Sequence, residues 1–326
     1  MTEPVPASPK AIEALRDEGP LAPPRSQAAD VWAQFRKHKG AMMGAAVLIF
    51  ITLAVLLGPY IWTLDPQRLD IRNKDLRPIY TALWDGTANV SWGHPFGTDN
   101  LGRDQLAQMI AGGRASLAVG WAAMVLSLLI GTGVGVLAGY FRRLDGPLMR
   151  ITDLFLSLPI LPLLLVAVTL FRQPLRAAFG PEGGMFILIV TIVGITSWMP
   201  TARIVRGDIL ALKEREFILA ARSIGTTSGK IIRRHLLPNV LSPIMVSATL
   251  GLATAIITES ALSFLGVGFP SDFPTWGKML ADAVPRMSEF PERVVLPGTA
   301  ISLTVLSVNY LGDGLRDALD PRLRGR

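Results

Sequence analysis

The strongest constraint on the fold is a series of long apolar runs. A helix that crosses a bilayer needs about 20 mostly apolar residues, because the hydrocarbon layer is about 30 Å thick. Six runs of roughly this length lie at 41–62, 114–140, 148–171, 184–205, 240–268 and 293–312. The sequence therefore predicts an all-α membrane protein with six transmembrane helices.

Composition agrees with a membrane protein. Half of the 326 residues are apolar and 17% are charged, a balance unlike that of soluble proteins. The chain has no cysteine, which excludes disulfides and thiolate metal sites. Its formal charge of +7 comes from Lys and Arg residues beside the apolar runs, so membrane topology explains the charge better than nucleic-acid binding does.

The distribution of basic residues predicts the orientation. Cytosolic flanks of membrane spans are enriched in Lys and Arg. Basic residues precede the first run, separate the second from the third, and dominate the segment 208–239. Positive and negative charges are more evenly balanced in 63–113, which we place on the periplasmic side. The predicted cytosolic parts are a flexible N-terminal tail (1–40) without a signal-peptide core, the segment 208–239, and a C-terminal tail (313–326).

A glycine-rich stretch in the second run has two interpretations. Gly131 and Gly133, with Ala138, formally match a dinucleotide-binding fingerprint. That fingerprint follows a strand, whereas this stretch lies within a continuous apolar run. Gly131, Gly135 and Gly139 share one helical face, so we predict that they let two membrane helices pack closely.

Nothing in the chain predicts an enzyme or a metal site. The sequence GTTSGK at 225–230 resembles a phosphate-binding loop, but isoleucine stands where its first glycine belongs and where its magnesium-binding hydroxyl belongs. Any ATP hydrolysis is therefore expected on another chain. The three histidines fall in separate regions, so they predict no metal site: His38, His94 and His235.

The segment 208–239 contains two short helical patterns, interrupted by Gly225 and ended by Pro238. Each pattern can present an apolar ridge. An amphipathic connector on the lipid headgroups and a docking surface for a partner explain these features equally well.

The sequence of this segment favours docking, because EFILAARSIGTTSGKIIRRHLLPN (216–239) resembles the EAA loop of ABC importer permeases. Four further stretches lie in the same order as in one class of these proteins: HPFGTDNLGRD (94–104), DGPLMRITDLFLSLP (145–159), ESALSFLGVGFPSDFPTWGKML (259–280) and NYLGDGLRDALDPR (309–322). Together they resemble the C-type membrane subunit of dipeptide, oligopeptide and nickel ABC importers.

The resemblance implies a type I (MetI-like) ABC importer permease fold in the bacterial inner membrane, with both termini cytoplasmic. A first anchor helix (41–62) would precede a five-helix core (114–312). The residues implied to form the ATPase-coupling surface are Glu216, Ala220, Ala221, Gly225, Pro238 and Asn239. The segment departs from the family's Glu-Ala-Ala pattern at one point. Phe217 and Ile218 stand between the glutamate and the alanines, so no small residue directly follows the glutamate.

The resemblance also implies partners. These are a second, distinct permease subunit, two ATP-binding subunits that hold ATP and magnesium, and a periplasmic or lipid-anchored binding protein. The chain itself would bind no cofactor. The cargo stays open among peptides, nickel, glutathione and sugar-like solutes, with a peptide-like solute preferred. An ion-coupled secondary carrier is the alternative function.

Two acidic residues near or within apolar runs need an explanation. Glu259 could line a watery path, but we favour a structural hydrogen bond to a neighbouring helix, in a polar setting to which Ser260 contributes. Asp153 is predicted to form an interfacial ion pair with the nearby Arg150.

Overall fold

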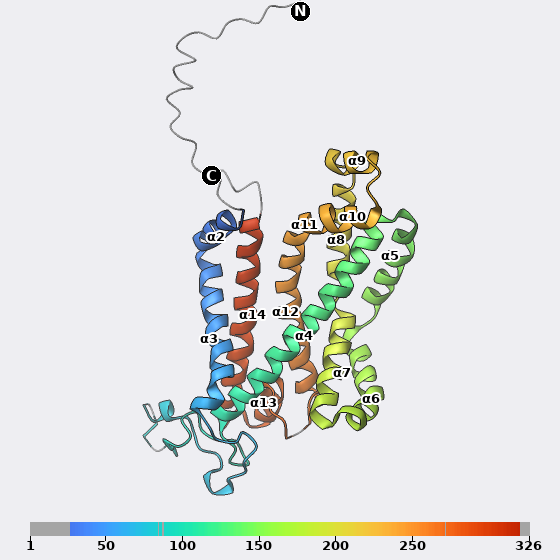
Figure 1. The fold of residues 1–326 in the computed structure, drawn as a ribbon. Helices are drawn as coiled ribbons and strands as arrows, with labels where there is room; N and C mark the ends of the chain where they lie inside the picture. The colour runs from blue at the N-terminus through green and yellow to red at the C-terminus, as the bar shows by residue number, and fades with distance from the viewer. Residues whose placement is uncertain (1–26, 84, 87, 271, 320–326) are drawn as a thin grey trace, which may run out of the picture.

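The chain forms a bundle in which long helices run between two ends of the molecule (Figure 1). The computed structural model describes residues 27–83, 85–86, 88–270 and 272–319. Its principal helices are α2 (Gln27–Lys37), α3 (Lys39–Ile61), α4 (Gln105–Tyr140), α5 (Arg142–Ser157), α6 (Ile160–Phe179), α7 (Pro181–Thr196), α8 (Met199–Leu212), α12 (Leu241–Phe264) and α14 (Glu292–Leu319). Shorter helices connect them at both ends.

Five of these helices are long and apolar enough to cross a membrane: α3, α4, α6, α12 and α14. The pair α7 and α8 passes the same test when taken together, with a bend of 41° between them. Ser197 and Trp198 form this break, and Pro200 opens the helix that follows. The five single helices and the one bent pair agree in number with the six predicted spans, although the fourth span is broken.

The third predicted span, 148–171, is wrong in its position. The chain leaves the helical conformation at Leu158, whose backbone is extended (φ −78°, ψ 138°), and α6 begins after Pro159. Proline has no N–H to donate and disfavours a helical conformation in the residue before it. The region therefore divides into the amphipathic α5 and the membrane-spanning α6.

Three predicted boundaries also move. Asp104 starts α4 before residue 114, because its side chain accepts the Ala107 N–H at 2.6 Å and caps the helix. The last residues of the predicted periplasmic segment, 105–113, thus belong to this helix. Residues 27–37, predicted to be part of a flexible tail, form α2. The helix α14 continues to Leu319, into the predicted C-terminal tail. Residues 1–26 and 320–326 lie outside the described part.

The N-terminal helix α2 is held by packing against the end of α14. Phe35 on α2, Ala41 on α3 and Ala318 on α14 form one buried cluster. The turn between α2 and α3 is capped by His38, whose Nδ1 accepts the Ala41 N–H at 3.0 Å. The described ends of the chain therefore meet at one end of the molecule, the end that also carries α9 (Figure 1).

The longest helix, α4, crosses the bundle and packs against α3, α7, α8 and α12. Three of its glycines face α8: a Cβ at Gly131 would lie 2.7 Å from the Trp198 carbonyl oxygen, and a Cβ at Gly135 would lie 2.7 Å from that of Ala202. Gly139 lies equally close to Ile209, whereas Gly133 faces open space. Close approach of α4 and α8 thus requires the glycine face that contains positions 131, 135 and 139.

Candidate functional site

A group of short helices connects α8 to α12 at the end of the molecule that holds the described termini (Figure 1). These are α9 (Glu216–Ser223), α10 (Ser228–Ile231), the π-helical turn η3 (Ile232–Leu236) and α11 (Leu237–Asn239). We call residues 213–239 the inner loop. It contains the two helical patterns predicted around Gly225, and a π-turn that the sequence did not predict.

Gly225 ends α9 in a left-handed conformation, with φ +76°. Its N–H donates to the Arg222 carbonyl at 2.9 Å, and the Thr226 N–H donates to the Ala221 carbonyl at 3.1 Å. These two bonds satisfy carbonyls that a helix end leaves unpaired. In the described chain, no heavy atom lies within 4 Å of a Cβ added at Gly225. The backbone angle, rather than packing, therefore requires glycine here.

The predicted coupling residues on α9 divide between two faces. Ile218 and Ala221 are buried in a cluster with residues of α8 and α12. Glu216 and Ala220 are exposed, and Ile224 is 82% exposed. The helix is thus fixed to the bundle by one face and presents the other, partly apolar, face outward.

Pro238 and Asn239 shape the connection from the inner loop into α12. Pro238 cannot donate a backbone hydrogen bond to the preceding turn. The Leu237 N–H donates to the Ile232 carbonyl in the π-turn, and Asn239 Nδ2 donates to the His235 carbonyl at 2.6 Å. A side-chain amide therefore satisfies a carbonyl of this irregular turn.

Ion pairs fasten α5 to α8 beside the inner loop. Arg206 donates two hydrogen bonds to Asp145, at 2.6 and 2.7 Å. Asp153 forms an ion pair, as predicted, but its partner is Arg203 rather than Arg150: its carboxylate accepts a hydrogen bond from Arg203 at 2.5 Å. The neighbouring helix α8 supplies the partner because α5 packs against it.

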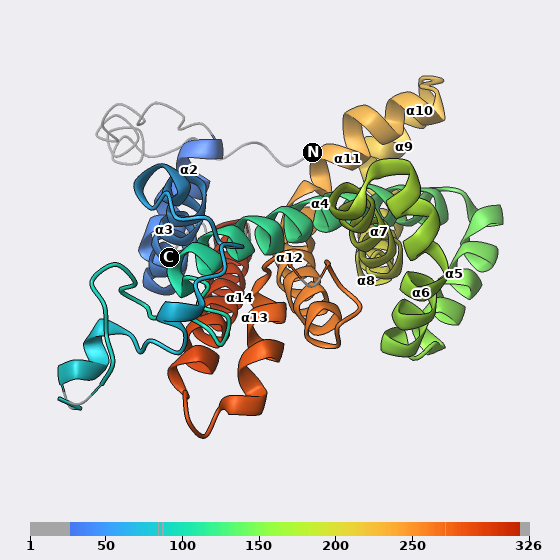
Figure 2. The ribbon, with the colours of Figure 1, turned by 90° about the horizontal axis from the view of Figure 1, so that it is seen from below.

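A cavity of about 270 Å³ lies where the α5–α6 and α7–α8 breaks approach α12. In the view from the outer end, α12 stands between α14 on one side and α7 and α8 on the other (Figure 2). The residues that line the cavity include no charged side chain. Six carry hydroxyl groups: Thr196, Ser197, Thr201, Ser247, Thr254 and Thr258.

Several of these hydroxyl groups already donate to their own helices. Thr196 Oγ1 donates to the Ile192 carbonyl at 2.7 Å, and Thr254 and Thr258 make the same bond to the carbonyl four residues earlier. Broken helices within a membrane occur where the free backbone faces protein or a watery path. The cavity combines such breaks with weakly polar walls, which suits passage of a solute better than tight binding.

The opposite, outer end carries residues 63–104, with two short helical turns, η1 (Ile71–Asn73) and η2 (Ile79–Leu83). Asp75 holds this segment to the turn η4 (Val284–Arg286) and to the start of α14. Its carboxylate accepts hydrogen bonds from Arg286 at 2.6 Å and Arg293 at 3.0 Å. Both guanidinium groups lie over the Phe290 ring, at 4.6 and 4.0 Å from its centroid. We call these four residues the outer clamp.

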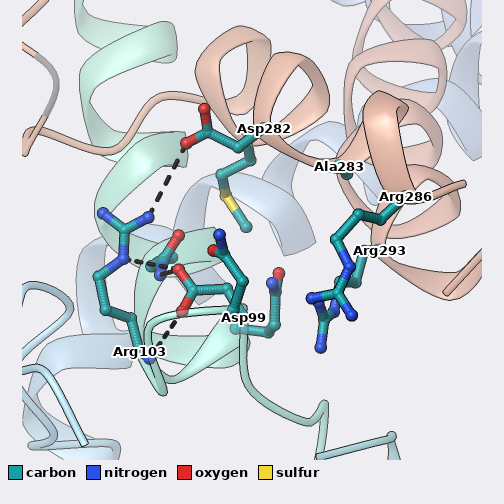
Figure 3. Close-up of a pocket in the computed structure, with 10 residues that line it drawn as sticks. Asp99, Arg103, Asp282, Ala283, Arg286 and Arg293 are labelled. Carbon is teal, nitrogen blue, oxygen red and sulfur yellow. Dashed lines mark hydrogen bonds and ion pairs between the residues drawn. The ribbon is translucent and has the colours of Figure 1, made fainter. Parts of the chain in front are cut away.

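A second set of charges lies beside the outer clamp (Figure 3). Arg103 donates to Asp99 at 2.6 Å and lies 3.8 Å from Asp282 of the helix α13 (Trp276–Ala283). Arg286 and Arg293 line the same small pocket from the opposite side. Sequence reasoning missed these partners: the pairs that join different elements are up to 218 positions apart, although Asp99 and Arg103 are close in sequence.

These features define a multi-pass membrane permease, with a hydroxyl-lined cavity at its broken helices and an exposed loop at one end. Residues 131–325 match the family described as binding-protein-dependent transport system inner membrane component. Residues 26–78 match the N-terminal TM domain of oligopeptide transport permease C. The chain belongs to the binding-protein-dependent permease family.

Curated relatives align with nearly the whole chain. The oligopeptide transport system permease protein OppC of Bacillus subtilis (strain 168) is 36% identical over 296 residues, which cover 90% of each chain. The dipeptide transport system permease protein DppC of the same organism is 38% identical over 304 residues, which cover 93% of this chain and 88% of the relative.

A solved structure supports the fold. An inward-facing structure of the MetNI methionine ABC transporter aligns with a TM-score of 0.52 at 20% identity, and covers 65% of this chain and 97% of that one. The resemblance to C-type permeases, the MetI-like fold and the function as an ABC importer permease are confirmed. The comparisons give no support to the secondary carrier.

Proposed function

We propose that this chain is one of two membrane subunits of a bacterial importer of peptides, and that its inner loop couples transport to ATP hydrolysis on partner subunits. The exposed face of α9 carries this proposal. Ile224 is 82% exposed at the tip of a helix that lies beyond the ends of the spans. Phe217, seven residues earlier and so on the same side of the helix, is 44% exposed, and apolar side chains grouped on a surface mark protein–protein contacts. Glu216, Ala220 and Gly225 belong to the same surface.

The complete importer would contain a second, distinct permease subunit, two ATPases and a substrate-binding protein. ATP and magnesium would be held by the ATPases, and this chain would hold no cofactor. The protein would lie in the inner membrane with both termini and the inner loop in the cytoplasm. The shared position of the loop and of the described termini at one end supports this orientation (Figure 1). The peptide cargo follows from the names of the two relatives.

The helix α8 gives the inner loop a direct mechanical connection to the cavity. Its first turn, with Met199 and Thr201, lines the cavity, and its last turn leads into α9. Gly131, Gly135 and Gly139 hold α4 tightly along this helix. A displacement of α9 by the ATPases would therefore move the cavity wall as part of a packed unit. ATP would favour one of two access states by binding the ATPases in only one arrangement.

The walls of the cavity suit a solute that varies in its side chains. Among the lining residues there is no charge, and Thr196, Thr254 and Thr258 have already donated their hydroxyl protons within their helices. A peptide would find few strong partners there and would not be retained. Selection among solutes would then fall to the binding protein rather than to this chain.

The replacement Gly225→Leu tests the coupling assignment. A side chain with a Cβ is strained by about 1–2 kcal/mol at φ +76°, while no neighbour within the described chain obstructs it. We expect normal insertion into the membrane but peptide uptake reduced by about tenfold or more, with ATP hydrolysis no longer linked to uptake. Gly133→Leu is the matched control, because Gly133 faces open space on a spanning helix. Unchanged uptake in Gly225→Leu would remove the coupling role.

Purification of the tagged chain from its native host in mild detergent tests the assembly. We expect ATPase subunits and a second permease to copurify, and a binding protein to stimulate ATP hydrolysis. A chain that purified alone and moved solute in vesicles under an ion gradient would contradict the proposal.

A further inference from the structure

Glu259 is a fully buried carboxyl group in the outer half of α12. It does not line the cavity, although its neighbour Thr258 does. In the described part of the chain, its polar neighbours are hydroxyl groups and include no basic side chain. The proposed transport function does not explain why an ionisable group stands here.

Four hydroxyl groups surround the Glu259 carboxyl. Ser263 Oγ donates to Glu259 Oε1 at 2.7 Å within the same helix. The other three belong to Ser260 on α12, Ser116 on α4 and Thr275, which precedes α13. Glu259 Oε2 and the oxygens of Ser116 and Ser260 are buried without a hydrogen-bond partner among the described residues. Donors and acceptors from three structural elements thus meet at one carboxyl group.

The backbones of these three elements also meet at this point. A Cβ at Gly277 of α13 would overlap the Ser260 carbonyl oxygen, and a Cβ at Gly112 of α4 would lie 3.1 Å from the Thr275 carbonyl carbon. The indole N–H of Trp276, a fully buried residue of α13, donates to a backbone carbonyl of α4 at 3.0 Å. The start of α13 therefore fits into a space that glycines leave between α4 and α12.

We propose that Glu259 is a positioning residue which, as an uncharged acid, fastens α13 and the outer half of α12 to α4, so that the three move together during transport. This inference rests on the proposed function, because the α12 segment next to Glu259 forms a wall of the cavity. The carboxyl group joins that wall to α13 on the outer side. We call Glu259, Ser116, Ser260, Ser263 and Thr275 the polar latch.

The uncharged state follows from the surroundings. A buried carboxylate without a cation beside it is costly in a membrane protein. An uncharged acid has one O–H to donate, and the unpartnered oxygens of Ser116 and Ser260 are acceptors within the polar latch. Its Oε1 accepts from Ser263, and the hydroxyl of Thr275, whose oxygen accepts the Lys278 N–H, is a further donor near the carboxyl group. The single O–H of the acid can thus supply a partner to one of the two hydroxyl oxygens that otherwise have none among the described residues.

Infrared spectroscopy of the purified complete importer tests the uncharged state independently of transport. The spectrum of the wild type minus that of Glu259→Gln should show one carboxylic-acid carbonyl band, which persists from about pH 6 to about pH 8 because water does not reach the group. A carboxylate band instead of the acid band would overturn the proposal. A band that changed on exchange of sodium for choline would also overturn it, by showing a bound cation.

Peptide uptake by the reconstituted importer tests the positioning role. Glu259→Gln should retain uptake within about twofold of the wild type, since the amide both donates and accepts. Glu259→Ala should lower uptake by about tenfold or more and weaken stimulation of the ATPase by the binding protein, because it leaves several buried hydroxyls unpaired. Glu182→Gln, an exposed change in the first turn of α7, is the matched control.

The outcomes separate the two proposals. If Glu259→Gln loses uptake as fully as Glu259→Ala, in complexes of equal amount and composition, the polar latch is wrong while the importer function stands. Copurification of the partner chains shows whether Glu259→Ala assembles. If it does not, Glu259→Gln and the infrared band test the proposal instead. If the wild type shows no ATP-driven uptake, the proposed function fails and the infrared result still decides the state of Glu259.

Discussion

The two ends of the molecule are built in opposite ways. The outer segment, residues 63–104, has little helix, yet ion pairs tie it to α13, η4 and α14. The inner loop is mostly helical, but α9 buries only one face and leaves Ile224 and Leu219 exposed. The outer segment is therefore tied to the bundle mainly by charged contacts, whereas α9 is attached through one apolar face.

The two ends are therefore suited to different tasks, a fixed platform on the outer side and a movable contact on the inner side. Ion pairs that are partly shielded from water hold the outer segment in one arrangement, which suits a fixed platform at the entrance of a transport path. The inner loop is attached through Ile218 and Ala221 to the same cluster as α8. Ile231 and Leu236 of the inner loop are buried in this cluster too, so a displacement of the loop would reach the bundle through several apolar contacts.

Two glycines with the same backbone angle give the largest expected contrast. Gly102 in the outer segment has φ +78°, and Gly225 in the inner loop has φ +76°. A Cβ at Gly102 would overlap the Asp70 carbonyl oxygen, whereas a Cβ at Gly225 meets nothing within 4 Å in the described chain. We expect Gly102→Ala to lower stability by about 3 kcal/mol or more, and Gly225→Ala by about 1–2 kcal/mol from strain alone.

Thermal unfolding of both variants in detergent measures this contrast. The midpoint should fall clearly for Gly102→Ala and only slightly for Gly225→Ala, while peptide uptake falls in both. Limited proteolysis should show new cleavage in the outer segment of Gly102→Ala. Equal loss of stability in the two variants would mean that the inner loop is packed as firmly as the outer segment, and the comparison would fail.

Two ion pairs give a smaller contrast. Asp75 in the outer clamp pairs with the buried Arg293, whereas Asp153 and Arg203 beside the inner loop are both more than half exposed. We expect Asp75→Ala to cost about 2 kcal/mol, between the values typical of exposed and fully buried pairs, and Asp153→Ala to cost less than about 1 kcal/mol.

A double-mutant cycle that combines Asp75→Ala with Arg293→Met would measure the coupling energy of the outer pair. Its coupling energy should exceed that of the cycle Asp153→Ala with Arg203→Met. The reverse order would show that the outer clamp contributes less to stability than its burial indicates.

The sequence predicted the spans and the inner loop because both depend on local patterns. Apolar runs of about 20 residues leave little choice but to cross the membrane. Gly225 marks the end of α9 because a left-handed residue is needed there. Pro159 was a local signal for the break between α5 and α6, and the prediction of a continuous third span overlooked it.

The outer clamp could not be predicted in this way. Asp75 lies more than 200 residues from Arg286 and Arg293 in the chain, so no spacing connects them. The partner of Asp153 was missed for a related reason: the local Arg150 was nearer in sequence, but packing of α5 on α8 brought Arg203 to it. Patterns within one element predict that element, whereas contacts between elements depend on how the helices pack.

The smallest expected effect concerns pH at the outer clamp. Burial raises the pKa of Asp75, but hydrogen bonds from Arg286 and Arg293 outweigh it and leave the pKa below its ordinary value. A carboxyl group whose pKa is lowered by folding stabilises the folded state above its unfolded pKa, about 3.9 for aspartate. This stabilisation is lost as pH falls through the lower, folded pKa. The clamp should therefore be insensitive to pH between about 5 and 8.

Comparison of the wild type with Asp75→Asn from acid to about pH 8 tests this direction of the pH dependence. The difference in resistance to proteolysis of residues 63–104 should stay constant above about pH 5, because Asp75 is fully ionised in both the folded and the unfolded chain. It should shrink in acid, where the wild type also loses its charge at this position. A difference that grew as pH fell, or that changed between about pH 6 and 8, would show that another group controls the outer segment. The outer end would then respond to its surroundings, and the contrast with the inner loop would no longer hold.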